Sequence, residues 1–152
     1  MSETMPVQKL AYEATLQITG ETNFGISMEE AMTGAKAIPP GGVRVDVPVQ
    51  GEISGPKLNG KLAGTDYLVL DSPGTGKLHV HAVITTGDGE RIALFADGCA
   101  NMEAGTPFSH LRENVRLYTA SDKYAWVNDR QFWSTGQVDL SNGKITLKTY
   151  LA

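Results

Sequence analysis

Two histidines separated by one residue stand out as groups that could do chemistry. His79 and His81 flank Val80, and on a β-strand positions i and i+2 face the same side, so both imidazoles would project into one space. Imidazole titrates near neutral pH, so the pair could act as general base and general acid. It could also bind a first-row metal, if Glu90 or His110 completed the ligand set. A polar pocket wall without metal, or an exposed sheet surface, remains an alternative.

A carboxylate and a set of aromatic residues could complete a pocket around this pair. Asp66 follows Gly64 and Thr65, where it would cap a turn, or would act in proton transfer if burial raised its pKa. Aromatic rings beside an amide suit a flat, partly polar ligand. The residues expected to bind such a substrate are Arg44, Tyr67, Tyr124, Trp126, Asn128 and Trp133. Core filling by the rings, and solvent exposure of the arginine, are the alternatives.

Two further sequence features are candidates for functional sites but are better explained as structural. The segment 72–77 is similar to the end of a phosphate-binding loop, but Asp71 stands where that loop needs glycine and Leu78 where it needs Ser or Thr. A hairpin turn is the simpler interpretation. Cys99 is the one cysteine of the chain, so it cannot form an intramolecular disulfide, and we interpret it as structural.

The elements that must position these residues are mostly strands. Apolar residues alternate with polar ones, most clearly over 43–49, where Pro48 indicates an edge or a bulge. The predicted strands cover residues 8–19, 43–49, 58–63, 67–70, 78–86, 92–96, 115–119, 132–140 and 144–150. Tight turns are predicted at Asn59-Gly60, Asp88-Gly89, Asp97-Gly98 and Asn142-Gly143. About nine short strands predict a closed or nearly closed antiparallel β-barrel.

One short helix is expected, over about residues 28–37. Ser27 and Glu30 have capping-box spacing, and apolar residues recur at helical spacing from Met28 to Ala35 before Pro39 and Pro40 end the pattern. A helix of two to three turns is not stable alone in water. We therefore expect it to pack on the sheet near the barrel mouth.

Composition narrows the class of protein. The chain has 152 residues, 41% hydrophobic and 20% charged, with a net charge of -4. These values predict one domain over residues 1–152 with a normal core. No apolar run reaches the roughly 18 residues of a membrane span, and the acidic start lacks the features of a signal peptide. We expect a cytoplasmic protein without a nucleic-acid or membrane partner.

A longer stretch of the chain resembles a known family. Gly42-Val43-Arg44-Val45-Asp46-Val47-Pro48-Val49, then Gly51 to Gly60, then Gly64-Thr65-Asp66-Tyr67 resemble the family called domain of unknown function 3237. The resemblance implies a small antiparallel barrel with a central cavity, often dimeric, with no assigned general activity. His79 and His81 stand where that family usually has an Asp and an Arg, and the segment 28–37 is longer than its usual connection.

These observations together predict a barrel enzyme that needs no cofactor. His79, His81 and Asp66 would exchange protons with a small apolar, aromatic or polyketide-like molecule, and Asn128 or Arg44 would bind a developing oxyanion. Isomerase, cyclase, dehydratase and lyase reactions fit this chemistry. The alternatives are a carrier barrel for a hydrophobic metabolite, with the histidines pointing outward, and a metal-dependent enzyme. Apolar residues on both faces of the strands also predict a possible homodimer.

Overall fold

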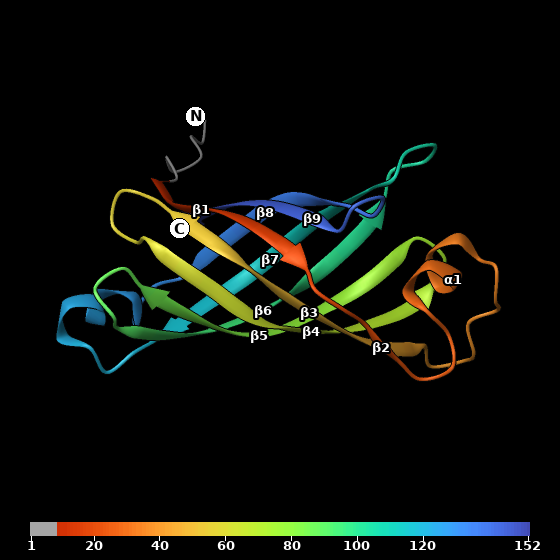
Figure 1. The fold of residues 1–152 in the computed structure, drawn as a ribbon, viewed down its shortest axis with the longest axis horizontal. Coiled ribbons are helices and arrows are strands. Elements are labelled where there is room, and N and C mark those ends of the chain that lie inside the picture. The colour runs from red at the N-terminus through yellow and green to blue at the C-terminus, as the bar shows by residue number, and fades with distance from the viewer. Residues whose placement is uncertain (1–8) are drawn as a thin grey trace, which may run out of the picture.

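Eight antiparallel strands close into a barrel in the computed structural model, which describes residues 9–152 (Figure 1). The barrel strands are β1 (Lys9–Ile18), β3 (Val43–Ser54), β4 (Gly60–Ser72), β5 (Thr75–Thr86), β6 (Arg91–Met102), β7 (Phe108–Tyr118), β8 (Phe132–Asp139) and β9 (Lys144–Leu151). Each strand from β3 to β9 pairs with the next, β9 pairs with β1, and the β1–β3 pairing closes the ring. A two-residue strand, β2 (Thr22–Asn23), extends the β3 edge. The predicted closed barrel is confirmed.

Two differences from the predicted strands affect the site. The segments 58–63 and 67–70 belong to one strand, β4, so Asp66 lies in mid-strand and not after a turn. The turn predicted at Asp97-Gly98 is wrong, because β6 runs straight through both residues. The Asn142-Gly143 hairpin between β8 and β9 is confirmed, with Gly143 at φ +74°.

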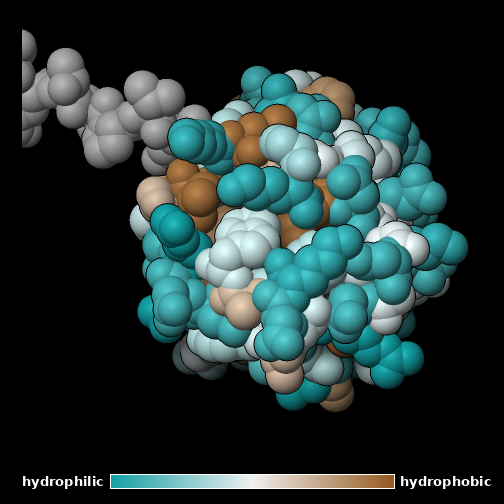
Figure 2. All heavy atoms as spheres, turned by 90° about the vertical axis from the view of Figure 1, so that its left-hand side faces the viewer, coloured by the Kyte–Doolittle hydropathy of each residue, from teal (hydrophilic) through white to brown (hydrophobic). Residues whose placement is uncertain are grey.

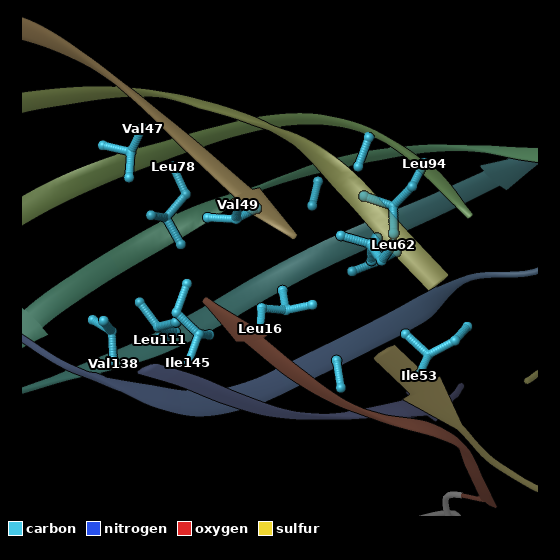
Figure 3. Close-up of a cluster of buried hydrophobic side chains, with 14 of the residues drawn as sticks. Leu16, Val47, Val49, Ile53, Leu62, Leu78, Leu94, Leu111, Val138 and Ile145 are labelled. Atoms are coloured by element: carbon cyan, nitrogen blue, oxygen red, sulfur yellow. The ribbon is translucent and has the colours of Figure 1, made fainter. Parts of the chain in front are cut away.

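Aliphatic side chains from all sides of the barrel meet in its lumen. In Figure 3, Leu16, Val49, Leu62, Leu94 and Leu111 converge from five different strands. All five are buried, and each occupies an inward position of an alternating pattern. The lumen is therefore an apolar core as well as the candidate binding space.

Two inward-facing glycines allow neighbouring strands to approach closely. A Cβ at Gly98 would collide with the carbonyl oxygen of Arg112, and a Cβ at Gly136 would collide with that of Thr146. Neither contact involves a flexible side chain that could move aside. Glycine at such points allows a strand to bend into a barrel.

The short helix α1 (Met28–Thr33) covers one end of the lumen. Ser27 accepts a hydrogen bond from the Glu30 N–H over 3.1 Å, and the Glu30 carboxylate accepts one from the Ser27 N–H, which completes the predicted capping box. The helix ends four residues earlier than predicted, because Gly34 adopts a left-handed conformation at φ 78°. Met28 and Met32 line the lumen, which confirms packing at the mouth.

Removal of this cap is expected to loosen α1 without unfolding the barrel. Ser27→Ala removes a cap worth about 1 kcal/mol, so amide hydrogens of residues 28–33 should exchange roughly five times faster while the melting temperature stays nearly constant. Ser121→Ala is the matched control, because Ser121 also occupies an N-cap position but makes no side-chain cap bond. Equal exchange in both variants would contradict this role of the capping box.

The opposite end of the barrel carries a 3-10 helix, η1 (Asp122–Val127), far from α1 along the long axis of Figure 1. Asp88 in the β5–β6 turn anchors it, accepting hydrogen bonds from Tyr124 Oη over 2.9 Å and from Lys123 Nζ over 2.5 Å. Figure 2 shows this end as largely hydrophilic, with a few hydrophobic residues among them. None of the helices within residues 9–152 is long and apolar enough to span a membrane.

Candidate functional site

The lumen encloses a cavity of about 90 Å³. Its lining is mainly aliphatic, with Met28 and Met32 of α1 at one end. The polar residues among the lining are Tyr12, Asp66, Ser109, Glu113 and Ser134. An apolar cavity with a few polar groups is the usual form of a small-molecule site.

Asp66 lies in the lumen wall at a break in the β4–β5 ladder. Bridges join Asp66 to Val80 and Val69 to Lys77, but the two pairs between them, Tyr67 with His79 and Leu68 with Leu78, are missing. Asp66 Oδ1 instead accepts a hydrogen bond from the His79 N–H over 2.9 Å. Burial raises the pKa of Asp66 to about 6, and the hydrogen bond from His79 opposes that rise.

Glu113 on β7 is the second carboxyl group of the lumen. Burial and, as the smaller cause, the nearby charge of Asp66 together raise its pKa to about 7. Two carboxyl groups in one apolar space thus have pKa values close to neutrality. Such shifts are common at catalytic sites, where a base and an acid must both be available near pH 7.

A row of hydroxyl groups continues from Glu113 across the next three strands. Glu113 pairs with Ser134, Ser134 with Thr149, and Thr149 with Tyr12. Ser134 Oγ and Thr149 Oγ1 lie 2.6 Å apart, and both side chains are buried. Burial raises the pKa of Tyr12 far above its usual value, although a hydrogen bond with Thr149 opposes the rise. Its phenol therefore remains a proton donor at neutral pH.

The prediction that both imidazoles face the lumen is wrong. His79 and His81 are exposed on the outer face of β5, whereas Leu78 and Ala82 are buried. The two rings do share one face, as predicted, and both pack edge-on against Phe95, at 6.0 and 5.4 Å between centroids. Alternation along the strand fixes the apolar residues inward, so the imidazoles must point outward.

Two predicted binding residues join the histidines on this outer face. Arg44 forms a two-point ion pair with Asp46, at 2.7 and 2.9 Å, and its guanidinium lies 5.4 Å from the ring centre of Tyr67. The Tyr67 ring packs 5.8 Å from His81. The sequence therefore identified a true spatial cluster, but on the outside of the wall.

The remaining predicted binding residues also lie away from the lumen. Trp133 is 47% exposed and lines an outer groove together with His79. Tyr124 and Trp126 belong to η1, and Asn128 caps it while bonding the backbone of Thr119. Their expected common face required an extended segment, and the 3-10 helix removes that geometry. Of the predicted site residues, Asp66 alone lines the lumen.

The proposed metal ligands do not come together. Within residues 9–152, the structure holds no group of three His, Cys, Asp or Glu side chains that could bind a metal ion. His110 lies 3.4 Å from Glu103 on the outer surface, and Cys99 is half-buried. The described residues therefore give no support to a metal site at the histidine pair.

Glu113 and Tyr12 are site residues that sequence reasoning missed. Glu113 occupies the same alternating face as Leu111 and Val115, both buried. A carboxyl group at an apolar position of a period-2 pattern is a signal of an inward charge. The predicted strand began only at residue 115, so this signal fell outside it.

Comparisons with solved structures agree on the fold. A β-barrel-like protein from Acinetobacter baumannii superposes with a TM-score of 0.79 at 17% identity, covering 99% of both chains. A conserved protein of unknown function from Rhodopseudomonas palustris gives 0.76 at 18% identity, also over 99% of both. An enzyme from Penicillium herquei gives 0.66 at 21% identity, covering 99% of this chain and 98% of the other.

Sequence comparison places the chain in a family. No curated protein matches it. The model of one family, described as protein of unknown function (DUF3237), matches residues 9–151. This match spans nearly the whole chain and agrees with the motif resemblance from Gly42 to Tyr67. The chain therefore belongs to the DUF3237 family.

Proposed function

We propose that this barrel is an enzyme that performs general acid–base chemistry on a small, mainly apolar molecule held in the lumen. The observation that supports the proposal is the pair of half-buried carboxyl groups that line the lumen, Asp66 and Glu113, with pKa values raised to about 6 and about 7. Removing carboxyl groups from water among aliphatic side chains reduces stability, so their presence in the lumen wall points to a function. Proton transfer is a function that needs this environment.

The two carboxyl groups have complementary roles. At neutral pH Asp66 is mostly ionised and removes a proton from the substrate, while the protonated fraction of Glu113 delivers a proton to another substrate atom. After this step Asp66 holds the proton and Glu113 is ionised. Exchange of protons with water returns Asp66 to its ionised form and Glu113 to its protonated form, so the catalytic cycle needs no other reactant.

The lining restricts the substrate and the reaction. Aliphatic walls favour a mainly hydrocarbon molecule, and the buried phenol of Tyr12 can donate to an oxygen that gains negative charge. The aromatic residues on which an aromatic substrate was predicted lie outside the lumen. Isomerisation, cyclisation, dehydration and lyase-type cleavage can all be catalysed by proton transfers of this kind, in which the bond between heavy atoms forms or breaks within the substrate itself.

Substrate access involves α1. A cavity of about 90 Å³ is smaller than the roughly 150 Å³ cavity that accepts benzene in another protein. Met28 and Met32 at the mouth have flexible side chains that can take new positions. We propose that α1 moves to admit the substrate and then excludes water during the reaction.

One relative supports enzymatic use of the fold. The Penicillium herquei protein, which shares the barrel at 21% identity, is described as an enzyme. This likeness concerns the fold, so the residues that we assign to catalysis depend on the geometry of the present lumen.

A carrier protein is the second candidate. The outward histidines and the mainly apolar cavity are the geometry expected of a barrel that only binds a hydrophobic metabolite. Such a carrier would have no use for two ionisable groups in its binding space. The carboxyl pair therefore favours the enzyme.

Chemical change of a bound compound distinguishes the two candidates. Small molecules extracted from the purified protein are identified by mass spectrometry and then incubated with fresh protein in D₂O. An acid–base enzyme should incorporate deuterium into the compound or convert it to an isomer or cleavage product. A carrier should return the compound with unchanged mass and structure.

The outer histidines should be dispensable in that assay. His79→Ala and His81→Ala remove side chains that lie outside the lumen, so each variant should keep turnover within about threefold of wild type, since neither can supply the roughly 100-fold or greater contribution of a general acid or base. Initial rates of deuterium incorporation measure this. If the initial rate fell 100-fold or more in either variant, the histidine replaced in that variant would be a catalytic residue after all.

A further inference from the structure

Ser109 is a buried polar residue that no interaction within the described chain explains. It lies on β7 with 0% exposure, and its Oγ has no hydrogen-bond partner among residues 9–152. Its paired neighbours, Met102 and Val138, are apolar. A buried hydroxyl without a partner destabilises a protein and requires an explanation.

The position of Ser109 points to a ligand. Ser109 lines the lumen cavity and stands near the start of β7, at the barrel end covered by α1 (Figure 1). Glu113 lies four residues further along the same inward face, which is about 13 Å along a strand. The buried residue between them, Leu111, is apolar. A molecule in the lumen therefore meets a hydroxyl near the mouth, an apolar wall and then the carboxyl groups.

We infer that the ligand carries a carbonyl or hydroxyl oxygen that hydrogen-bonds Ser109 Oγ and thereby fixes its orientation. This inference rests on the proposed function, because it concerns the molecule held in the same lumen. It narrows the substrate class from any apolar molecule to one oxygenated at the end nearest α1. The rest of the molecule then extends toward Asp66 and Glu113. Ser109 is thus a positioning residue, and the carboxyl groups remain the reacting ones.

Two isosteric probes test the inference without knowledge of the substrate. Cyclobutanone has a carbonyl oxygen where methylenecyclobutane has a CH₂ group, so their affinities differ mainly through hydrogen bonding, and both are smaller than benzene, as a cavity of about 90 Å³ requires. Dissociation constants for both are measured by NMR titration of the full chain, following methyl groups of Leu111 and Val138 that line the cavity. The quantity of interest is the ratio of the two affinities.

Ser109→Ala should reduce this ratio. One neutral hydrogen bond corresponds to a loss of about 3- to 10-fold in cyclobutanone affinity, while methylenecyclobutane should bind Ser109→Ala as well as it binds wild type. Ser109→Cys, which keeps a side chain of similar shape with a weaker donor, should give an intermediate ratio. Ser121→Ala is the control, because Ser121 Oγ also lacks a partner but does not line the cavity.

Stability and a second variant separate the possible outcomes. Ligand-free Ser109→Ala should melt at or above the wild-type temperature, because it loses an unsatisfied hydroxyl; a clear decrease would indicate a structural bond and overturn the inference. Glu113→Gln should keep the wild-type ratio. If the ratio falls in Glu113→Gln and not in Ser109→Ala, the oxygen contacts the carboxyl group, so the inference fails while lumen binding stands. Failure of both probes to bind wild type would also overturn it.

Discussion

Glu113→Gln should lower turnover by about 100- to 10,000-fold, the usual contribution of a general acid or base. The amide keeps the shape of the side chain but cannot transfer a proton at the operating pH. Asp66→Asn should have a comparable effect, and the double variant should lose little more, because both groups act in one reaction. Initial rates with the compound extracted from the protein measure all three variants.

Glu52→Gln is the matched control for this series. Glu52 is an exposed glutamate on β3, so its replacement makes the same chemical change without touching the lumen. Its turnover should equal that of wild type. If Glu113→Gln and Glu52→Gln both kept the turnover of wild type, the carboxyl pair would have no catalytic role. That result would favour the carrier function over the enzyme.

The second large effect concerns stability against pH. Burial raises the pKa values of Asp66 and Glu113 from 3.8 and 4.5 to about 6 and about 7. Between about pH 4 and pH 7 the folded protein therefore holds protons that the unfolded chain has released. Stability must fall as pH rises through this window, since the unfolded state binds fewer protons. The free energy of unfolding should be lower at pH 8 than at pH 5 by on the order of 4 kcal/mol.

Urea unfolding at the two pH values checks this dependence. The double variant Asp66→Asn/Glu113→Gln should abolish most of the difference, because it no longer titrates in the lumen. Asp88 has a lowered pKa, mainly because Lys123 donates a hydrogen bond to it, so its contribution is lost only at more acidic pH. Wild-type stability that rises from pH 5 to pH 8 would show that the carboxyl groups are not desolvated.

The fold followed from local sequence patterns. Alternation over 43–49 and the Asn142-Gly143 turn correspond to β3 and the β8–β9 hairpin. The interruption expected at Gly64 and the turn expected at Asp97-Gly98 did not occur. At those points long-range pairing to the next strand overrides the local preference of glycine for turns.

The functional site was harder to predict from the sequence than the fold, because its residues depend on which face of each strand points into the lumen. Period-2 spacing placed His79 and His81 on one side, but it left open whether that side was the lumen. The alternating Leu78, Ala82 and Ile84 on the opposite face, all buried, decide the question. Asp66 on β4 and Glu113 on β7 both line the lumen, although β5 and β6 lie between their strands. No local sequence pattern reveals that these two residues share one space.

The inward glycines of the barrel restrict how its binding space can be redesigned. At aliphatic positions such as Leu94 or Val138, a larger or smaller aliphatic side chain can replace the present one. Each such substitution changes the volume of the lumen by about one or two methyl groups. At Gly98 and Gly136 even alanine would push two backbones apart. New specificities, in natural relatives or in the laboratory, should therefore arise from substitutions at the inward positions that already carry side chains, with these glycines left unchanged.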